Sequence, residues 1–360
     1  MRIKGPLSSP RILFVADAGP AVGGGHVMRS LTLARALADE GAACAFIATP
    51  AVTTVLDAFG ADAAQVEAAA ATPADLVTAA ARAAQDVDAV VIDHYGLSAP
   101  DHRAIAGGTP VLVIDDLADR ALAADLVLDS GPARAAADYD GLLPPHAELL
   151  LGPSHAPVRP AFAALRREAL ARRANAPPVR RILVSLGLTD VGGITGRVVD
   201  LILPRLKTGG AGKAVLDVVL GSGASSLPGL RALAARDPRL ALHVDSQDMP
   251  RLTLEADLAV GAGGSSSWER CVLALPTLLL VLAANQDEAS QALAEADAVL
   301  ALDVAEPGFE AAFATELCRL LADPALRDRL SSASAAVCDG RGAARVAAHF
   351  LDLIARRQAG

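Results

Sequence analysis

The chain has 360 residues, which is long for a single hydrophobic core and suits two domains. Its formal net charge of −9 argues against DNA, RNA or an anionic membrane surface as the main partner. The longest apolar run, residues 273–284, contains Pro276 and is too short to cross a bilayer, so we expect no membrane insertion and, without a recognisable signal peptide, a cytoplasmic protein.

After a loose tail at Met1–Pro10, short β-type runs alternate with helical runs. A strand is predicted at residues 11–16, and a helix follows at residues 26–39, where apolar residues recur near one face. Further strands of the first half are predicted at 43–48, 89–92, 111–114 and 125–128. Such alternation indicates a parallel sheet with helices on both faces.

The middle of the chain, residues 156–178, contains several prolines and an arginine-rich helical piece, and we interpret it as a linker. It separates an N-terminal domain, residues 1–155, from a C-terminal domain, residues 179–360. The last helix of the chain is expected to pack either in the second domain or back on the first. Strands of the second half are predicted at 181–185, 215–220, 241–244, 258–260 and 277–281. The predicted fold class is α/β with two facing Rossmann-like domains, and ligands are expected in the cleft between them, beyond the carboxyl ends of the strands.

Three glycines and a histidine lie between the first strand and the first helix, in the order Gly23-Gly24-Gly25-His26. The pattern is not GxGxxG, and no acidic residue ends the second strand, which argues against NAD. A helix start disfavours a protonated imidazole, so His26 is expected in its neutral form, which accepts a proton from water. The alternative, which spacing leaves open, is that His26 only caps the helix.

Acidic residues end two further strands of the first half, in the segments Asp93-His94-Tyr95 and Asp115-Asp116. Carboxylates suit hard cations, but there is no DxD spacing, and two glycine loops are able to neutralise a diphosphate, so no metal is expected. The alternatives for the aspartate pair are loop capping or pairing with Arg120. Arg29 is either a solvated charge or a partner of one of these aspartates.

The most informative stretch follows the strand at 258–260 and reads Gly261-Ala262-Gly263-Gly264-Ser265-Ser266-Ser267-Trp268-Glu269-Arg270. A glycine loop between a strand and a helix presents backbone N–H groups to a phosphate. Glu269 is placed to accept hydrogen bonds from a ribose diol, so the stretch predicts a nucleotide site. The amides of Ala284-Asn285-Gln286 bind phosphate or sugar hydroxyls, or simply cap the next helix.

Other chemistry-bearing residues are interpreted as structural. The four cysteines form no CxxC pair and are expected to be buried, reduced thiols. Trp268, the single tryptophan, is expected to pack its helix rather than stack on a base.

Together, these motifs resemble the UDP-2,4-diacetamido-2,4,6-trideoxy-β-L-altropyranose hydrolases of pseudaminic acid synthesis. The resemblance rests on Gly24-Gly25-His26-Val27-Met28-Arg29, Asp93-His94-Tyr95, Asp115-Asp116, Asp138-Tyr139-Asp140-Gly141-Leu142, Gly263-Gly264-Ser265-Ser266-Ser267-Trp268-Glu269-Arg270-Cys271 and Ala284-Asn285-Gln286. It extends from residue 11 to about residue 299. The second-half loop also looks like the UDP-GlcNAc-binding loop of the murein glycosyltransferase, which has the GT-B architecture.

The resemblance implies hydrolysis of a UDP-sugar at its anomeric C–O bond, with inversion and without metal or cofactor. It implies that His26 positions or deprotonates the attacking water and that Tyr95 orients the sugar or the water. Glu269 would hold the ribose diol, Ser265 and Ser266 the diphosphate, and Asn285 the sugar or its phosphate link. The full predicted substrate-binding set is Gly24, Gly25, Arg29, Asp93, Gly264, Ser265, Ser266, Glu269, Asn285 and Gln286.

The chain departs from the family pattern at Leu188, where a second glycine is usual, and at Asp129, which replaces part of an Asn-Gln-Asn type turn. These residues bear on the sugar pocket, so the N-acyl pattern of the sugar stays open. The oligomeric state and the fate of the product, flagellin glycosylation or a surface polysaccharide, are open as well. Two other functions remain: a GT-B glycosyltransferase using a UDP-sugar donor, and a non-catalytic sugar-nucleotide-binding protein.

Overall fold

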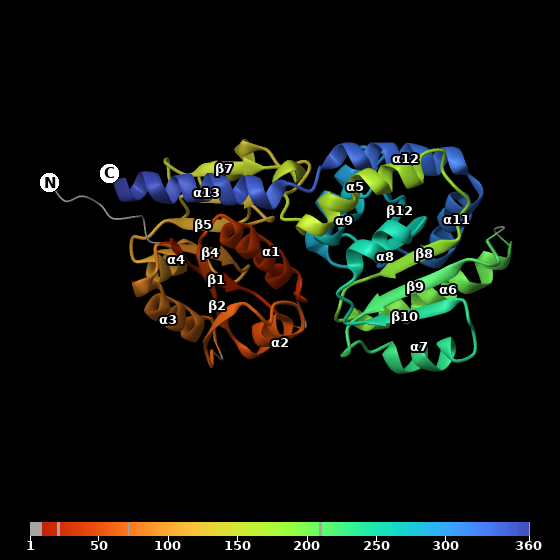
Figure 1. Cartoon of the computed structure of the whole chain (residues 1–360), viewed down its shortest axis with the longest axis horizontal. Helices are drawn as coiled ribbons and strands as arrows, with labels where there is room; N and C mark the ends of the chain where they lie inside the picture. Colours follow the sequence, from red (N-terminus) through yellow and green to blue (C-terminus); the bar gives the residue numbers. More distant parts are fainter. Residues whose placement is uncertain (1–8, 20–21, 71, 209–210, 360) are drawn as a thin grey trace. The chain divides into compact units, whose positions relative to one another are not determined.

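The computed structural model describes residues 9–19, 22–70, 72–208 and 211–359, so most of the tail expected at Met1–Pro10 lies outside the described residues. The chain forms two compact units (Figure 1). The first comprises Met1–Ser130, Arg134–Pro157 and Gly342–Gly360. The second comprises Gly131–Ala133 and Val158–Arg341.

The first unit contains a parallel sheet of seven strands in the order β3-β2-β1-β4-β5-β6-β7. The strands are β1 Arg11–Ala16, β2 Ala43–Ala48, β3 Ala64–Glu67, β4 Ala89–Asp93, β5 Val111–Ile114, β6 Leu126–Asp129 and β7 Glu148–Leu151. The helices are α1 Gly25–Asp39, α2 Pro50–Phe59, α3 Pro73–Ala83, α4 Ala99–Ala106 and α13 Gly342–Ala359. All the predicted strands of this half are present, and β3 and β7 are strands that the sequence pattern missed.

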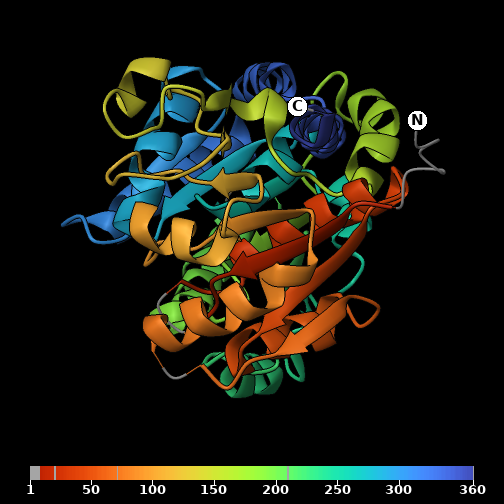
Figure 2. The ribbon, with the colours of Figure 1, turned by 90° about the vertical axis from the view of Figure 1, so that its left-hand side faces the viewer.

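Alternation along the strands builds a core on each face of this sheet. In β1, Ile12 and Phe14 pack with side chains of α1, α2 and α13, whereas Leu13 and Val15 pack with side chains of α3 and α4. Helix α13, at the C-terminal end of the sequence, therefore belongs to the core of the first unit. It is seen end-on beside the C label in Figure 2.

The second unit contains a parallel sheet of six strands in the order β10-β9-β8-β11-β12-β13. These are β8 Arg181–Ser185, β9 Val215–Leu220, β10 Leu240–Val244, β11 Leu258–Ala262, β12 Thr277–Val281 and β13 Leu300–Asp303, of which only β13 was not predicted. The helices are α5 Pro160–Arg173, α6 Ile194–Thr208, α7 Leu227–Ala234, α8 Met249–Glu255, α9 Ser266–Val272, α10 Asp287–Glu295, α11 Phe309–Ala322 and α12 Pro324–Val337. Both units thus have the doubly wound α/β fold expected from the alternation.

Each sheet has a point where the strand order reverses. Strand β1 lies between β2 and β4, and β8 lies between β9 and β11. Loops that leave the carboxyl ends of such neighbouring strands diverge to opposite faces and open a crevice for ligands. His26 follows β1 and Asp93 ends β4, while the glycine loop follows β11, so each motif lies at the reversal point of its own unit.

The residues expected to form a linker are largely part of the second unit, which begins at Val158. Arg166 of α5 donates to the carbonyl oxygens of Val272 and Ala335, and Arg173 donates to those of Thr253 and Ala256. These arginines bind carbonyl groups at the ends of other helices, which explains why an arginine-rich, proline-flanked segment is integral to the fold.

Trp268 is buried, as expected, and Cys44, Cys271, Cys318 and Cys338 are free thiols. Of these thiols only Cys271 and Cys338 are buried, whereas Cys44 and Cys318 are partly exposed, so the expected burial holds for two of the four. Burial raises the pKa of Cys44 and of Cys271 to about 12, which makes both poor nucleophiles at neutral pH.

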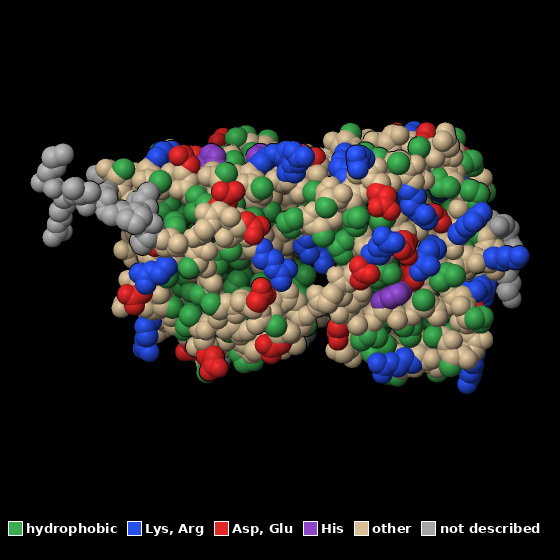
Figure 3. Space-filling model, viewed as in Figure 1, with side chains coloured by type: hydrophobic (Ala, Val, Ile, Leu, Met, Phe, Trp, Pro, Cys, Tyr) green, Lys and Arg blue, Asp and Glu red, His purple; other side chains and the backbone are tan. Residues whose placement is uncertain are grey.

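Basic and acidic side chains are interspersed on the face of the molecule drawn in Figure 3. None of the helices in the described ranges combines the length and the apolar character needed to cross a bilayer.

Gly342, the first residue of α13, is expected to tolerate no side chain. A Cβ atom there would lie 2.5 Å from the carbonyl carbon of His155 and would overlap the carbonyl oxygen of Ala156. Because these are backbone atoms, Gly342→Ala is expected to lower the free energy of unfolding by about 1–3 kcal/mol in urea denaturation. Gly229→Ala, in the exposed face of α7 with nothing within 4 Å, is the control that leaves stability equal or higher. Equal stability of the two variants would contradict this packing.

Candidate functional site

His26 lies in the first turn of α1, immediately after a closed glycine loop. Gly19 and Gly23 exchange two backbone hydrogen bonds, and Gly23 has a φ of 71°. Gly24 is the residue before the helix, so Gly25 and His26 are already helical. Asp93 pairs with Ala16 in the register between β1 and β4, which brings the end of β4 next to the start of this loop.

The imidazole of His26 is held by the carboxylate of Asp93. Nδ1 lies 2.6 Å from Oδ1 of Asp93, and the two side chains are only 6% and 1% exposed. A carboxylate only accepts, so Nδ1 carries the hydrogen, and in the neutral ring the lone pair lies on Nε2. Within the described ranges Nε2 has no protein hydrogen-bond partner. The side chain of His26 therefore does not cap α1 but presents Nε2 as a hydrogen-bond acceptor.

Arg29 holds the other side of Asp93. Its Nε and Nη2 donate to the two oxygens of Asp93 at 2.7 and 2.6 Å, and its Nη1 donates to Oδ2 of Asp116 at 2.7 Å. Burial by itself raises the pKa of Asp93, but Arg29 and His26 outweigh it and hold that pKa well below its usual range. Asp93 is thus an ionised, buried acceptor for His26.

Tyr95 completes this group of residues. Its hydroxyl donates to Oδ1 of Asp116 at 2.7 Å, and its ring meets the ring of His26 edge to face, with centroids 4.5 Å apart. We call His26, Arg29, Asp93, Tyr95 and Asp116 the His26 cluster. Of the residues predicted in the first half, the structure brings His26, Arg29, Asp93 and Tyr95 together through direct contacts.

Asp115 is not part of the His26 cluster. Its Oδ1 accepts from Arg120, and its Oδ2 accepts from the backbone of Ala118 and from the hydroxyl of Tyr139. Asp115 thus has both alternative roles stated for it from the sequence, loop capping and pairing with Arg120. The departure residue Asp129 is buried next to it, and its Oδ2 lies 2.9 Å from the Tyr139 hydroxyl, whose single hydrogen is shared between the two carboxylates. In the part of the chain that the structure describes, no three His, Cys, Asp or Glu side chains are grouped as metal ligands.

In the second unit, the glycine loop is built over the buried side chain of Arg270. Its guanidinium donates to the carbonyl oxygen of Ala262 and to the hydroxyls of Ser266 and Ser267. A Cβ atom at Gly261 would lie 2.5 Å from that guanidinium. The sequence singled out Ser266 as a ligand but missed Arg270, which reads as an ordinary helix charge. Burial lowers the pKa of Arg270 to about 10, so it is still a cation at neutral pH.

Glu269 and Asn285-Gln286 flank this loop. Oε1 of Glu269 accepts a hydrogen bond from Nε of Arg159 and forms an ion pair with its Nη2, both at 2.8 Å. Asn285 and Gln286 form a single turn of 3-10 helix after β12. The amide oxygen of Gln286 accepts from the backbone of Leu282, on the strand side of the turn, and among the described residues no side chain caps the following helix α10. A Cβ atom added at Gly264 would have no neighbouring atom within 4 Å, so the space beside this residue is open. Ser265 is the residue before the first turn of α9.

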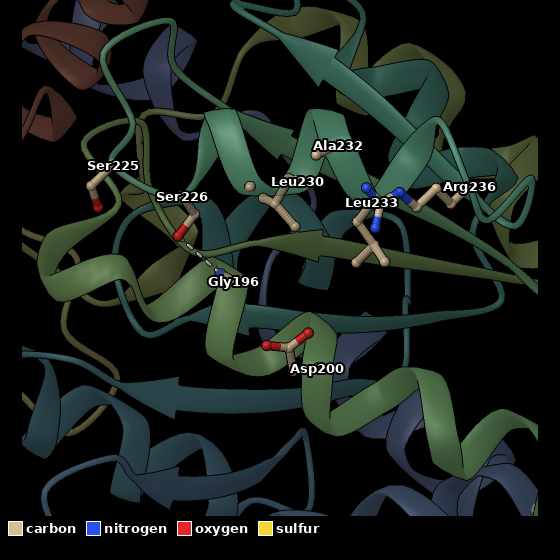
Figure 4. Close-up of a pocket in the computed structure, with 9 residues that line it drawn as sticks. Gly196, Asp200, Ser225, Ser226, Leu230, Ala232, Leu233 and Arg236 are labelled. Atoms are coloured by element: carbon tan, nitrogen blue, oxygen red, sulfur yellow. Dashed lines mark hydrogen bonds between the residues drawn. The ribbon is translucent and has the colours of Figure 1, made fainter.

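A separate groove of about 440 Å³ lies between α6 and α7 (Figure 4). Ser226 at its edge accepts a hydrogen bond from the backbone of Gly196. None of the predicted site residues lines this groove, and its lining is a mixture of small, apolar and charged side chains that indicates no particular ligand.

Comparison with known proteins gives distant relatives, and no family model matches the chain. The spore coat polysaccharide biosynthesis protein SpsG of Bacillus subtilis is 27% identical over 204 residues, which cover 56% of this chain and 58% of that protein. The UDP-2,4-diacetamido-2,4,6-trideoxy-beta-L-altropyranose hydrolase of Campylobacter jejuni is 23% identical over 287 residues, which cover 79% of this chain and 96% of that protein.

A third relative is the UDP-N-acetylglucosamine–N-acetylmuramyl-(pentapeptide) pyrophosphoryl-undecaprenol N-acetylglucosamine transferase of Sorangium cellulosum, 32% identical over 199 residues, or 52% of this chain and 47% of that protein. The chain therefore matches little more than half of the first relative and about half of the third. Among solved structures, Acinetobacter baumannii MurG matches with a TM-score of 0.65 and 18% identity, over 96% of this chain and 99% of that one. The fold is that of the GT-B glycosyltransferases.

Proposed function

We propose that this protein is a cytoplasmic enzyme that hydrolyses a UDP-linked 2,4-diacetamido-2,4,6-trideoxy sugar to UDP and the free sugar, as a step of pseudaminic acid synthesis. The observation that carries the proposal is the contact between Nδ1 of His26 and the buried carboxylate of Asp93, at 2.6 Å. Homology over 79% of this chain and 96% of the Campylobacter hydrolase supports the same reaction and substrate.

In the proposed reaction, His26 is the general base. Nε2 accepts a proton from water as the water oxygen bonds to the anomeric carbon, and the bond between that carbon and the phosphate oxygen breaks. The electron pair leaves with UDP, and attack opposite to the leaving group inverts the anomeric centre. Asp93 holds the ring in the tautomer that frees Nε2 and stabilises the imidazolium that forms.

Arg29 matters because an ionised Asp93 in this buried place needs a compensating charge. With Arg29 contacting both Asp93 and Asp116, the pair of carboxylates is partly neutralised before any substrate binds. Tyr95, fixed by Asp116, is proposed to orient the sugar or the water.

The second unit is proposed to hold the nucleotide. The glycine loop with Gly264, Ser265 and Ser266 is assigned to the diphosphate, and Glu269 is assigned to the ribose diol. Asn285 is assigned to the sugar or its phosphate link. Gly24, the residue before α1, and Gly25, its first residue, are assigned to the sugar side.

Hydrolysis is expected to proceed at an unchanged rate in EDTA and to place ¹⁸O from labelled water in the sugar and none in UDP. The reason is that the carboxylates at the end of β4 and β5 already accept from Arg29 and Arg120, and the leaving diphosphate is assigned to backbone amides. Mass spectrometry of both products after reaction with the altropyranose substrate measures the outcome. Loss of activity in EDTA that Mg²⁺ restores, or ¹⁸O in UDP, contradicts the mechanism.

A glycosyltransferase using a UDP-sugar donor is the second candidate, and the GT-B fold favours it. The same base would then deprotonate an acceptor hydroxyl in place of water. Incubation of the enzyme with radiolabelled UDP-sugar and a membrane extract separates the two functions. Label transferred to lipid or protein faster than to water supports the transferase, whereas free sugar as the main product with or without extract supports the hydrolase.

A further inference from the structure

Arg159, which no sequence motif singled out, is fixed on two sides in the second unit. Its guanidinium carbon lies 5.0 Å from the centre of the Phe162 ring, and that ring is fully buried. Nε and Nη2 both reach Glu269, 110 residues further along the chain. Arg159 directly precedes α5, so the helix start determines where its side chain begins.

Both contacts of Arg159 go to one oxygen of Glu269. Oε1 accepts a hydrogen bond from Nε and forms an ion pair with Nη2, each at 2.8 Å, and Oε2 has no hydrogen-bond partner among the described residues. The Glu269 side chain is 16% exposed. The carboxylate therefore has one oxygen engaged by the arginine and one oxygen left to accept from a ligand.

The surroundings of Glu269 leave Arg159 as its main source of positive charge. Among the described residues, the charged and titratable side chains around α9 include Arg159, Arg166, Arg270, Cys271, Cys338 and Asp339, which acts on Cys338. Arg270 directs its guanidinium to Ala262, Ser266 and Ser267 instead, and Arg166 directs its own to backbone carbonyls. Burial raises the pKa of Glu269, and Arg159 opposes this rise most strongly.

We propose that Arg159 is a positioning residue that keeps Glu269 a carboxylate and orients it so that Oε2 accepts from a ribose hydroxyl of the nucleotide. The inference rests on the proposed function, because it takes Glu269 as the ribose ligand. Without Arg159, a largely buried carboxyl becomes protonated at a higher pH and turns freely, and both changes weaken the hydrogen bond to the ribose.

The test uses the full-length protein with Arg159→Met, Arg159→Lys and Glu269→Gln, and two ligands, UDP and 2′,3′-dideoxy-UDP. Calorimetry from pH 6 to pH 9 measures affinity. Carboxyl ¹³C NMR of glutamate-labelled protein measures the titration of Glu269, whose signal is identified by its absence in Glu269→Gln. The NMR measurement needs no ligand, so it reports on the arginine contact even if nucleotide binding fails.

Arg159→Met is expected to weaken UDP binding about 10- to 100-fold at pH 6.5 and to recover most of it at pH 9. In Arg159→Met, the affinity for dideoxy-UDP is expected to stay at the wild-type value, and Glu269 is expected to titrate at a higher pH than in the wild type. For Arg159→Lys, the UDP affinity and the titration of Glu269 are expected to lie between those of the wild type and Arg159→Met. Arg197→Met is the matched control, because Arg197 also contacts one oxygen of a glutamate, Glu310, and lies over a phenylalanine ring, but in an exposed pair. It is expected to leave all these values unchanged.

Equal weakening of UDP and dideoxy-UDP at every pH, or an unchanged titration of Glu269 in Arg159→Met, overturns the inference while the proposed hydrolysis stands. Wild-type protein that binds UDP and dideoxy-UDP equally overturns both the inference and the ribose role of Glu269. If Arg159→Met does not fold, Arg159→Lys carries the same test with a smaller shift in the same direction.

Discussion

His26→Ala is expected to lower the turnover of the UDP-sugar about 10²- to 10⁴-fold, the contribution typical of a positioned general base. UDP affinity is expected to stay within about twofold, since the nucleotide is assigned to residues of the second unit and each twofold change is well under 1 kcal/mol. Steady-state kinetics measure the turnover, and calorimetry with UDP measures the affinity. A loss in kcat without a loss in UDP binding is the signature of a group that acts only on the reacting atoms.

His146→Ala is the matched control for this experiment. His146 is a largely exposed histidine of the first unit, 3.3 Å from Asp125 and not in contact with the His26 cluster. Its replacement is expected to leave kcat and KM unchanged. If His26→Ala keeps most of its turnover, His26 is not the base and the proposed mechanism is wrong.

Asp93→Asn is expected to lower the free energy of unfolding by about 3–5 kcal/mol, because it removes one partner of a buried ion pair and leaves Arg29 poorly compensated. The amide introduced by this substitution would have one accepting oxygen, whereas the donors of Arg29 and His26 contact both oxygens of Asp93. The NH₂ group of the amide would therefore face an N–H donor of Arg29 or of His26. Turnover is expected to fall as well, since His26 loses the acceptor that sets its tautomer.

Urea denaturation at several pH values measures this contribution. The pKa of Asp93 is lower in the folded chain than in the unfolded one, so its stabilising effect is complete above the unfolded value of about 4. The effect is lost as the pH falls from there toward the lowered folded value, so the stabilities of wild type and Asp93→Asn are expected to converge in acid.

The control is Asp62→Asn, which alters a surface pair with Arg35 at 3.7 Å and is expected to cost less than about 1 kcal/mol. Wild-type stability in Asp93→Asn at pH 7 contradicts the assignment of a buried, compensated carboxylate. A difference between the two proteins that persists unchanged at low pH contradicts the charge of Asp93 as its cause.

The central strands of both sheets were predictable because each is a short apolar run that is buried on both faces. Residues 11–16 and 277–281 are such runs, and their buried state follows from composition alone. The strands missed by the pattern are β3, β7 and β13, which lie at sheet edges. Every residue of β3 is exposed, so only its pairing with β2 makes it a strand.

The segment 156–178 was expected to be a linker but is largely part of the second unit, and long-range contacts explain the difference. Prolines and arginines are typical of exposed connections, and the composition of this segment predicted one. In the structure, Arg173 is buried and bound to the carbonyl groups that end α8. Burial of a guanidinium depends on acceptors far away in the sequence, so no local pattern indicates it.

By itself, the sequence determined which residue types follow which strands: glycines and His26 after the first strand, an aspartate at the end of β4, and the glycine-serine loop with Glu269 after β11. These are local features, and they can be predicted because loops and helix starts favour particular residue types. The contacts that complete each group join residues far apart: His26 and Asp93 are separated by 67 positions in the sequence, and Arg159 and Glu269 by 110. The pairing of β1 with β4 brings His26 to Asp93, and the packing of α5 against α9 brings Arg159 to Glu269. Both depend on the packing of a whole unit, so no local pattern indicates them.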